Sequence, residues 1–182
     1  MATLGHVAAG AVGARWRAGR VATTPLVFSM VGLVALALLP DIDFIAFHLG
    51  IPYRHPFGHR GATHSPAFAI LVGALVAATL RAFGRRVLRD ALLVTAVVAT
   101  HGLLDALTTG GLGVEFFWPF SPARYFLPVR FIPVAPLGGG MLSTYGAAVL
   151  GVEAVLFLPA WLYAFWPRRE PAVESQSVKP AA

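Results

Sequence analysis

The chain has 182 residues, the length of one domain, of which 57% are hydrophobic and only 12% are charged. Its mean hydropathy of +0.72 excludes an ordinary soluble domain and indicates an integral membrane protein. The net charge is +6, but the arginines flank apolar segments instead of forming one basic run, so nucleic acid is not an expected partner.

The first predicted element is a short helix over residues 3–14, rich in small residues, with Thr3 as its N-cap. It rises only about 18 Å, so it crosses a bilayer core of about 30 Å only if it continues through Trp16. Otherwise it packs among the other helices. An apolar segment over 21–39 is long enough to span the membrane, and Pro40 is expected to end it.

Three further spans are predicted, over 66–83, 87–109 and 143–166. Ser65 is the expected N-cap of the first of these, with proline in the next position. The connection over 110–143 is rich in Gly, Pro and aromatic residues, and a loop of this length is usually functional or re-entrant.

The predicted fold is therefore all-α, an integral membrane bundle of about four spans plus a short N-terminal helix. We expect a membrane-embedded domain over 1–166 and a polar, disordered tail over 167–182.

The distribution of basic residues predicts an orientation. If every apolar segment crosses, the first included, ten of the fourteen Lys and Arg residues fall on one side, which is cytoplasmic by the positive-inside rule. The other four, on the extracytoplasmic side, are Arg54, Arg60, Arg124 and Arg130. The same alternation brings the histidine-rich loop and the ends of two helices to that extracytoplasmic face.

The strongest chemical signal is the pair His101 and Asp105 in the 87–109 span. Residues four apart on a helix share a face, with Cβ atoms about 6 Å apart, close enough to hold one metal ion. A polar pair capped by water is the simpler interpretation in a soluble helix, but ionisable residues inside a span usually mark a site.

The stretch 38–65 holds two of the four aspartates and four of the six histidines. Asp41 and Asp43 follow a helix C-terminus, where the dipole disfavours carboxylates without a compensating cation; ordinary turn chemistry explains them equally well. In extended chain both reach one centre, or Asp41 binds the metal while Asp43 orients a histidine. His64 is the favoured ligand because a capped helix holds it, whereas His59 supports it or faces the substrate.

His6 is drawn into the set only by its place on the same predicted face, because a lone helical histidine is more often a satisfied polar residue. The chain has no cysteine, so imidazole and carboxylate must bind any metal. They favour zinc, with manganese or iron as alternatives. The predicted ligands, sufficient for one or two ions, are His6, Asp41, His64, His101 and Asp105.

Such a centre would activate water and clamp a phosphoryl-type substrate, with Asp105 expected to bridge two ions. The candidate catalytic residues are Asp43, His59 and Glu115, although a loop glutamate is more often only solvated. The candidate substrate-binding cations are Arg60, Arg124 and Arg130, for which contact with lipid phosphate is an equal alternative. Glu153, inside the last span, is expected to be functional or hydrogen-bonded to a buried partner.

A GH near the start, then LLPDID, HRGATHS, HGLLDALTTGG and a WPF loop, over roughly residues 4–165, resemble the YdjM-like family of bacterial inner-membrane proteins, which is described as metal-dependent hydrolases. That family is grouped with the zinc-dependent phospholipase C and single-strand nuclease superfamily, which is all-helical. The resemblance implies that His101 and Asp105 match its HxxxD zinc pair, that Asp41 or Asp43 matches its earlier aspartate, and that His64 and His6 match its other histidines. The later HxxxE pair is incomplete, because Val149 precedes Glu153 by four positions, which speaks against a third metal.

We therefore expect a multi-pass protein of the bacterial inner membrane that hydrolyses a phosphoester in a lipid or amphiphile. The alternatives are a transporter or metal-handling protein that uses the same ligands, and a scaffold fixed by metal. Transporter sites tend to lie near the bilayer midplane on interrupted helices, which favours the enzyme for ligands at span ends.

Overall fold

The computed structural model describes residues 2–19, 24–84, 87–136 and 138–166, and its named elements are all helices. Outside the helices, the described residues pair only in two isolated β-bridges. The all-α prediction is confirmed. The predicted tail over 167–182 and the first residues of the 21–39 segment lie outside the described residues.

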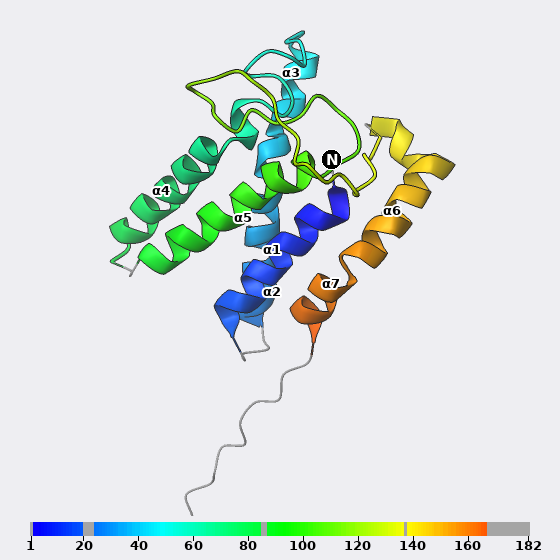
Figure 1. Ribbon diagram of the computed structural model, residues 1–182. Helices are drawn as coiled ribbons and strands as arrows, with labels where there is room; N and C mark the ends of the chain where they lie inside the picture. Colours follow the sequence, from blue (N-terminus) through cyan, green and yellow to red (C-terminus); the bar gives the residue numbers. More distant parts are fainter. Residues whose placement is uncertain (1, 20–23, 85–86, 137, 167–182) are drawn as a thin grey trace, which may run out of the picture.

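The long helices run up and down between two ends of a bundle, so that α1 begins, α2 ends, α4 begins, α5 ends and α6 begins at the same end (Figure 1). Helix α1 packs against α2 and α7, and α4 packs against α5. The bounds are α1 Thr3–Ala18, α2 Thr24–Leu38, α4 Pro66–Ala82, α5 Leu88–Ala106, α6 Thr144–Leu156 and α7 Leu158–Phe165.

Helix α1 is longer than predicted and continues past Trp16. Thr3 lies inside the helix, so the prediction that it is the N-cap is wrong. Ala2 occupies that position, and no side chain of the cap residue bonds the helix. Gly10 allows α1 to approach α2 closely, because a Cβ there would lie 2.5 Å from the Cα of Val34.

Helix α2 ends at Leu38, close to the end predicted from Pro40, but helical structure does not stop there. After α2 the chain continues as the 3₁₀ helix η1 (Leu39–Phe44) and the short helix α3 (Ile45–His48). Proline is tolerated in the first turn of a helix, where its missing N–H has no intrahelical partner to lose. Asp41 and Asp43 therefore lie in a 3₁₀ helix and not in extended chain.

Helix α4 begins as predicted. Ser65 is its N-cap and accepts a hydrogen bond of 3.1 Å from the Phe68 N–H, and Pro66 is the first helical residue. The 3₁₀ helix η2 (Ala62–His64) ends directly before this cap, which fixes the backbone of His64.

The predicted 143–166 span is not one straight helix. Helices α6 and α7 meet at Phe157 with a bend of 61°. Pro159 lies in the first turn of α7, and proline cannot donate the backbone hydrogen bond that a continuous helix needs.

By length and composition, one continuous helical stretch, Leu26–His48, could cross a membrane, or two stretches could if the bent α6–α7 pair is one span. Helix α4, with 17 residues, is apolar but shorter. Only 28% of the apolar window in Leu26–His48 is buried, whereas the core helix of a soluble protein would be mostly buried. Four spans stay a prediction.

At the end where α1, α4 and α6 begin, the connections over 49–65 and 107–136 fold together (Figure 1). The Thr109 N–H donates to the Ile132 carbonyl at 2.9 Å, and the Glu115 N–H donates to the Arg60 carbonyl at 3.1 Å. These two connections cover the polar residues described below.

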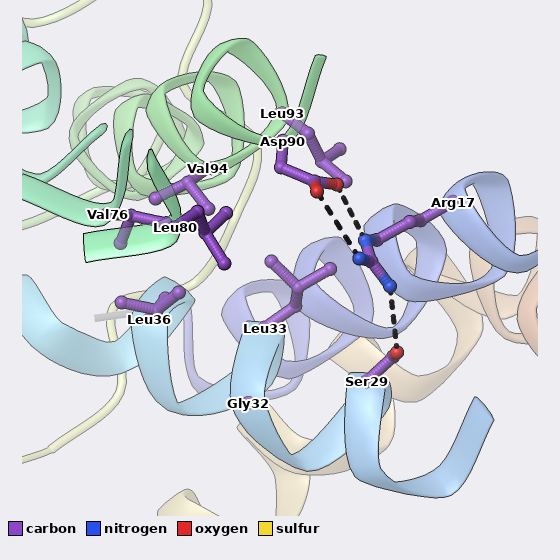
Figure 2. Close-up of a pocket in the computed structure, with 10 residues that line it drawn as sticks. All are labelled: Arg17, Ser29, Gly32, Leu33, Leu36, Val76, Leu80, Asp90, Leu93 and Val94. Atoms are coloured by element: carbon purple, nitrogen blue, oxygen red, sulfur yellow. Dashed lines mark hydrogen bonds and ion pairs between the residues drawn. The ribbon is translucent and has the colours of Figure 1, made fainter. Parts of the chain in front are cut away.

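The opposite end holds an apolar cavity of about 190 Å³ between α2, α4 and α5 (Figure 2). At its edge Arg17 is paired with Asp90 at 2.7 Å, and Ser29 lies beside the same guanidinium. The cavity includes no histidine, so it is separate from the candidate site.

Candidate metal centre

Five buried or nearly buried polar side chains from four segments meet at the covered end of the bundle. The side chain of Asp41 is 12% exposed, and the other four residues are 3% exposed or less. They are His6 from α1, Asp41 from η1, His64 from η2, and His101 and Asp105 from α5. The convergence predicted from the sequence is thus present in the fold. We call these five residues the cluster.

The distances within the cluster exceed those of hydrogen bonds. His6 Nε2 lies 3.4 Å from Asp105 Oδ1, and His64 Nε2 lies 3.5 Å from Asp105 Oδ2. Asp41 Oδ1 lies 3.4 Å from His101 Nε2 and 3.8 Å from His64 Nε2. A tetrahedron with ligands about 2.0–2.1 Å from its centre has edges of about 3.3 Å, so the four separations suit ligands of shared metal ions.

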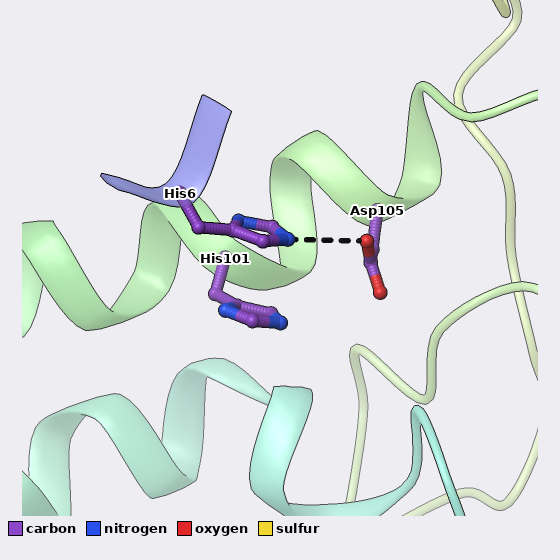
Figure 3. A group of neighbouring side chains, drawn as sticks. All are labelled: His6, His101 and Asp105. Atoms are coloured by element: carbon purple, nitrogen blue, oxygen red, sulfur yellow. Dashed lines mark ion pairs between the residues drawn. The ribbon is translucent and has the colours of Figure 1, made fainter. Parts of the chain in front are cut away.

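Among the residues that the structure describes, two groups of three side chains could each hold an ion, with ligand atoms all within 4.8 Å of one another. One consists of His6, His101 and Asp105, drawn in Figure 3. The rings of His6 and His101 stack, with centroids 3.6 Å apart. The other group is Asp41, His59 and His64. His59, predicted to support the ligands or to face the substrate as a catalytic residue, is therefore also placed to bind metal.

Neighbouring acceptors fix the orientation of three imidazoles. The His101 Nδ1–H donates to the Ala37 carbonyl at 2.7 Å, so that Nε2 faces the cluster. Asp43 accepts from Nδ1 of both His59, at 2.8 Å, and His64, at 3.1 Å. Hydrogen bonds of this kind commonly hold metal-binding histidines.

The same carboxylate of Asp43 also accepts from the Arg60 N–H at 3.1 Å and from the Thr63 hydroxyl at 2.8 Å. These four donors occupy both carboxylate oxygens of Asp43, so neither oxygen is left for a metal ion. Of the two alternatives left by the sequence, this geometry favours the second, in which Asp41 is a ligand and Asp43 orients histidines, over the first, in which both aspartates reach the metal.

Several buried ligand atoms have no hydrogen-bond partner among the described residues. They include Nε2 of His64, Nε2 of His101 and both carboxylate oxygens of Asp41. Because an unsatisfied buried polar atom is costly, these atoms indicate a missing partner. Imidazole and carboxylate donors fit zinc, manganese or iron.

Burial and neighbouring carboxylates change the pKa values of two histidines at the site. Burial lowers the pKa of His64, but contacts with Asp105 and Asp43 outweigh burial and raise it to about 9. Burial also lowers the pKa of His59, against the opposing effect of Asp43. Without metal, His64 therefore carries a proton near neutral pH, and a metal ion would have to displace it.

Arg60 is not the free substrate-binding cation that the sequence suggested. Its side chain is 1% exposed, Nε lies 2.9 Å from Asp105 Oδ2, and Nη1 donates to the Gly110 carbonyl at 2.9 Å. Its backbone is left-handed, with φ of 63°, which is costly for a residue with a side chain. Arg60 therefore neutralises and fixes the Asp105 carboxylate.

Arg124 and Glu115 form an ion pair with each other and do not contact the side chains of the cluster. Arg124 Nη2 lies 2.8 Å from Glu115 Oε1, and Arg124 donates to the carbonyls of Tyr53, His55 and His59. Burial raises the pKa of Glu115, and Arg124 opposes that effect. A structural ion pair explains Glu115 better than a general base does.

Arg130 is the remaining predicted cation, and it is exposed, with its guanidinium 4.8 Å from the Phe126 ring centroid. Sequence reasoning assigned no role to Thr63 or Ala37. Thr63 stands in the HRGATHS stretch beside the predicted ligand, which is a usable signal, but a backbone carbonyl such as that of Ala37 leaves no trace in a sequence.

Comparison with known proteins gives a family. A family model described as "YdjM inner membrane protein" matches residues 1–171. The inner membrane protein YbcI of Escherichia coli (strain K12) is 41% identical over 142 residues, which is 75% of this chain and 82% of that protein. No solved structure matches the chain at a significant level.

Proposed function

The chain belongs to the YdjM inner membrane protein family, and from that premise we propose that it is a metal-dependent hydrolase of the inner membrane. The proposal is carried by one observation: imidazole and carboxylate atoms from four segments converge at 3.4–3.8 Å in a buried cluster. The substrate class we propose is a phosphoester in a lipid or amphiphile.

In this proposal the cluster holds one or two divalent ions, with zinc favoured. The ligands are the five residues of the cluster, with His59 as a further candidate for the second group. A bound ion of this class activates water near neutral pH and polarises a phosphoryl oxygen.

The protein's own residues supply orientation. Asp43 holds His59 and His64 through their Nδ1 atoms, and the Ala37 carbonyl holds His101. Arg60 fixes one oxygen of Asp105. Because Asp41 has the most exposed side chain of the cluster, at 12%, water and substrate would approach the ions beside it.

We further propose that the bundle crosses the bilayer about four times, with the cluster on the extracytoplasmic side. The outward faces of α2 and α4 support this arrangement, since Val27, Phe28, Ile70 and Leu75 are each more than half exposed. The excess of basic residues that the sequence predicts for the opposite side, ten against four, supports the orientation. Arg130 is then an accessible cation for an anionic head group at the outer interface.

The direct test is metal removal and return. We expect the purified full-length protein in detergent or nanodiscs to contain about one or two divalent ions per chain, measured by elemental analysis. Hydrolysis of generic phosphoesters and phospholipids should be lost after chelation and restored by zinc or manganese.

A metal-free parent protein with an intact fold would contradict the proposal. Bound metal without hydrolysis of any tested phosphoester would favour the metal-handling alternative, which vesicle uptake of the same metal would then test. Bound metal with neither activity would leave a scaffold role.

A second prediction concerns Asp43, which we propose orients His59 and His64. In Asp43→Asn an NH₂ group replaces one of the two carboxylate oxygens. This group cannot accept the hydrogen bond from an imidazole N–H, so one of the two rings loses the contact that orients it. We expect metal affinity to fall about 10–100-fold, with unchanged stoichiometry at saturating metal. Competition with a chromophoric chelator measures the affinity.

The matched control is Asp90→Asn, which removes a carboxylate at the opposite end of the bundle, paired there with Arg17. Its metal affinity should stay within about two-fold of the parent. Equal affinities of the Asp43→Asn variant and the parent would show that Asp43 does not orient the ligands.

A further inference from the structure

The N-terminus of α1 is stabilised by a residue from the other end of the chain. A helix begins with four N–H groups that lack intrahelical partners, and Ala2, at the N-cap, has no side chain that could satisfy them. The Leu4 N–H instead donates to Glu153 Oε2 at 2.7 Å. Glu153 belongs to α6 and is 0% exposed.

An aromatic ring extends this contact, a helical turn further along the chain. Phe157 follows Glu153 by four residues, and its ring lies against Gly5, where an added Cβ would be only 2.5 Å from the ring. Glu153 and Phe157 therefore share one face of the helical end, and the first turn of α1 is held between a hydrogen bond and an aromatic ring.

His6 belongs to the same first turn, two residues after Leu4. Its Nε2 reaches Asp105 at 3.4 Å, and its ring stacks on His101. A site of this kind tolerates displacements of only about 0.5 Å, so a shift of the α1 start along its axis would remove His6 from the cluster.

A buried carboxylate in an apolar helix is costly unless it is compensated. The partial positive charge at a helix N-terminus and its free N–H groups provide that compensation. Within the described part of the chain, the groups that could hold a metal do not include Glu153. The carboxylate is therefore explained by α1 and not by direct coordination.

We propose that Glu153 is a positioning residue, whose carboxylate caps α1 from α6 and thereby holds His6 in the metal cluster. This inference rests on the proposed metal site. The bent α6–α7 pair thus supports the metal site, although it contributes none of the proposed ligands.

Two conservative variants of the full-length protein separate the effect of the length of the Glu153 side chain from the effect of its charge. Glu153→Gln keeps the length and an acceptor oxygen but loses the charge. Glu153→Asp keeps the charge but withdraws the oxygens by one methylene. We expect Glu153→Gln to bind zinc within about three-fold of the parent and Glu153→Asp to bind at least about ten-fold more weakly.

Two further readouts distinguish positioning from general stability. In metal-free protein, hydrogen exchange of the peptide that contains Leu4 should be faster in Glu153→Asp and unchanged in Glu153→Gln. With cobalt in place of zinc, the d–d spectrum should change in Glu153→Asp alone. The control Val149→Ala truncates a buried residue one turn earlier on α6, and it should lower thermal stability without changing metal affinity or spectrum.

Parent-like metal affinity in Glu153→Asp, or equal losses in both variants, would overturn the inference, because reach would then not matter. Loss of affinity in Val149→Ala would also overturn it, since stability alone would explain the effect. If the parent binds no metal, the proposed function fails and His6 has no ion to bind, whereas the exchange result still decides whether Glu153 caps α1.

Discussion

The His101→Ala variant is expected to lose bound metal and to show hydrolysis no faster than the chelated parent. His101 Nε2 faces Asp41 at 3.4 Å, and its tautomer is set by the bond from Nδ1–H to the Ala37 carbonyl. Changes to residues that only orient ligands cost about 10–100-fold in metal affinity, so removal of a ligand should cost at least about 100-fold. Elemental analysis and chelator competition measure the loss.

The matched control is His48→Ala, because His48 is an exposed histidine outside both groups that could hold metal. It should keep the metal content and the rate of the parent. Circular dichroism of both variants checks the helical fold. Full metal content in a folded His101→Ala variant would exclude the cluster as the metal site.

The sequence predicted which polar side chains lie together better than it predicted the path of the chain. Spacing alone placed His101 and Asp105 on one helix face, and the alternation of apolar segments brought His6 and the 38–65 stretch to the same end. The Ser65–Pro66 pair marked the start of α4 correctly. These signals are local or periodic, so they survive without knowledge of tertiary contacts.

Prolines misled the prediction of helix ends. Pro40 was expected to end a helix, but it lies in the first turn of η1, where its missing N–H costs nothing. Pro159 was placed inside one continuous span, and the structure bends there by 61°. Which outcome occurs depends on the neighbouring packing, which composition does not report.

The structure differs from the prediction at Arg60, Arg124 and Glu115 for another reason. Arg60 and Arg124 were candidates for contact with substrate or with lipid phosphate, yet both pair inside the protein, with Asp105 and Glu115 respectively. Arg60 has a left-handed backbone and a buried side chain, and nothing in its neighbours in the sequence predicts that conformation. Long-range pairing of this kind requires coordinates.

The Arg60→Met variant is expected to be strongly destabilised in the absence of metal, because it breaks the buried ion pair between Arg60 and Asp105. Breaking a buried ion pair by removing one partner costs about 3–5 kcal/mol, because the remaining charge stays buried. We expect that loss in the unfolding free energy of metal-free protein, followed by circular dichroism in one detergent.

Saturating zinc should raise the unfolding free energy of Arg60→Met more than that of the parent. The reason is that the ion supplies positive charge beside Asp105 when the guanidinium is gone. The control Arg130→Met removes an exposed guanidinium that lies over Phe126, and it should change the unfolding free energy by no more than about 0.5 kcal/mol. If zinc stabilises Arg60→Met and the parent equally, the metal does not bind next to the Asp105 carboxylate, and the proposed centre must lie elsewhere.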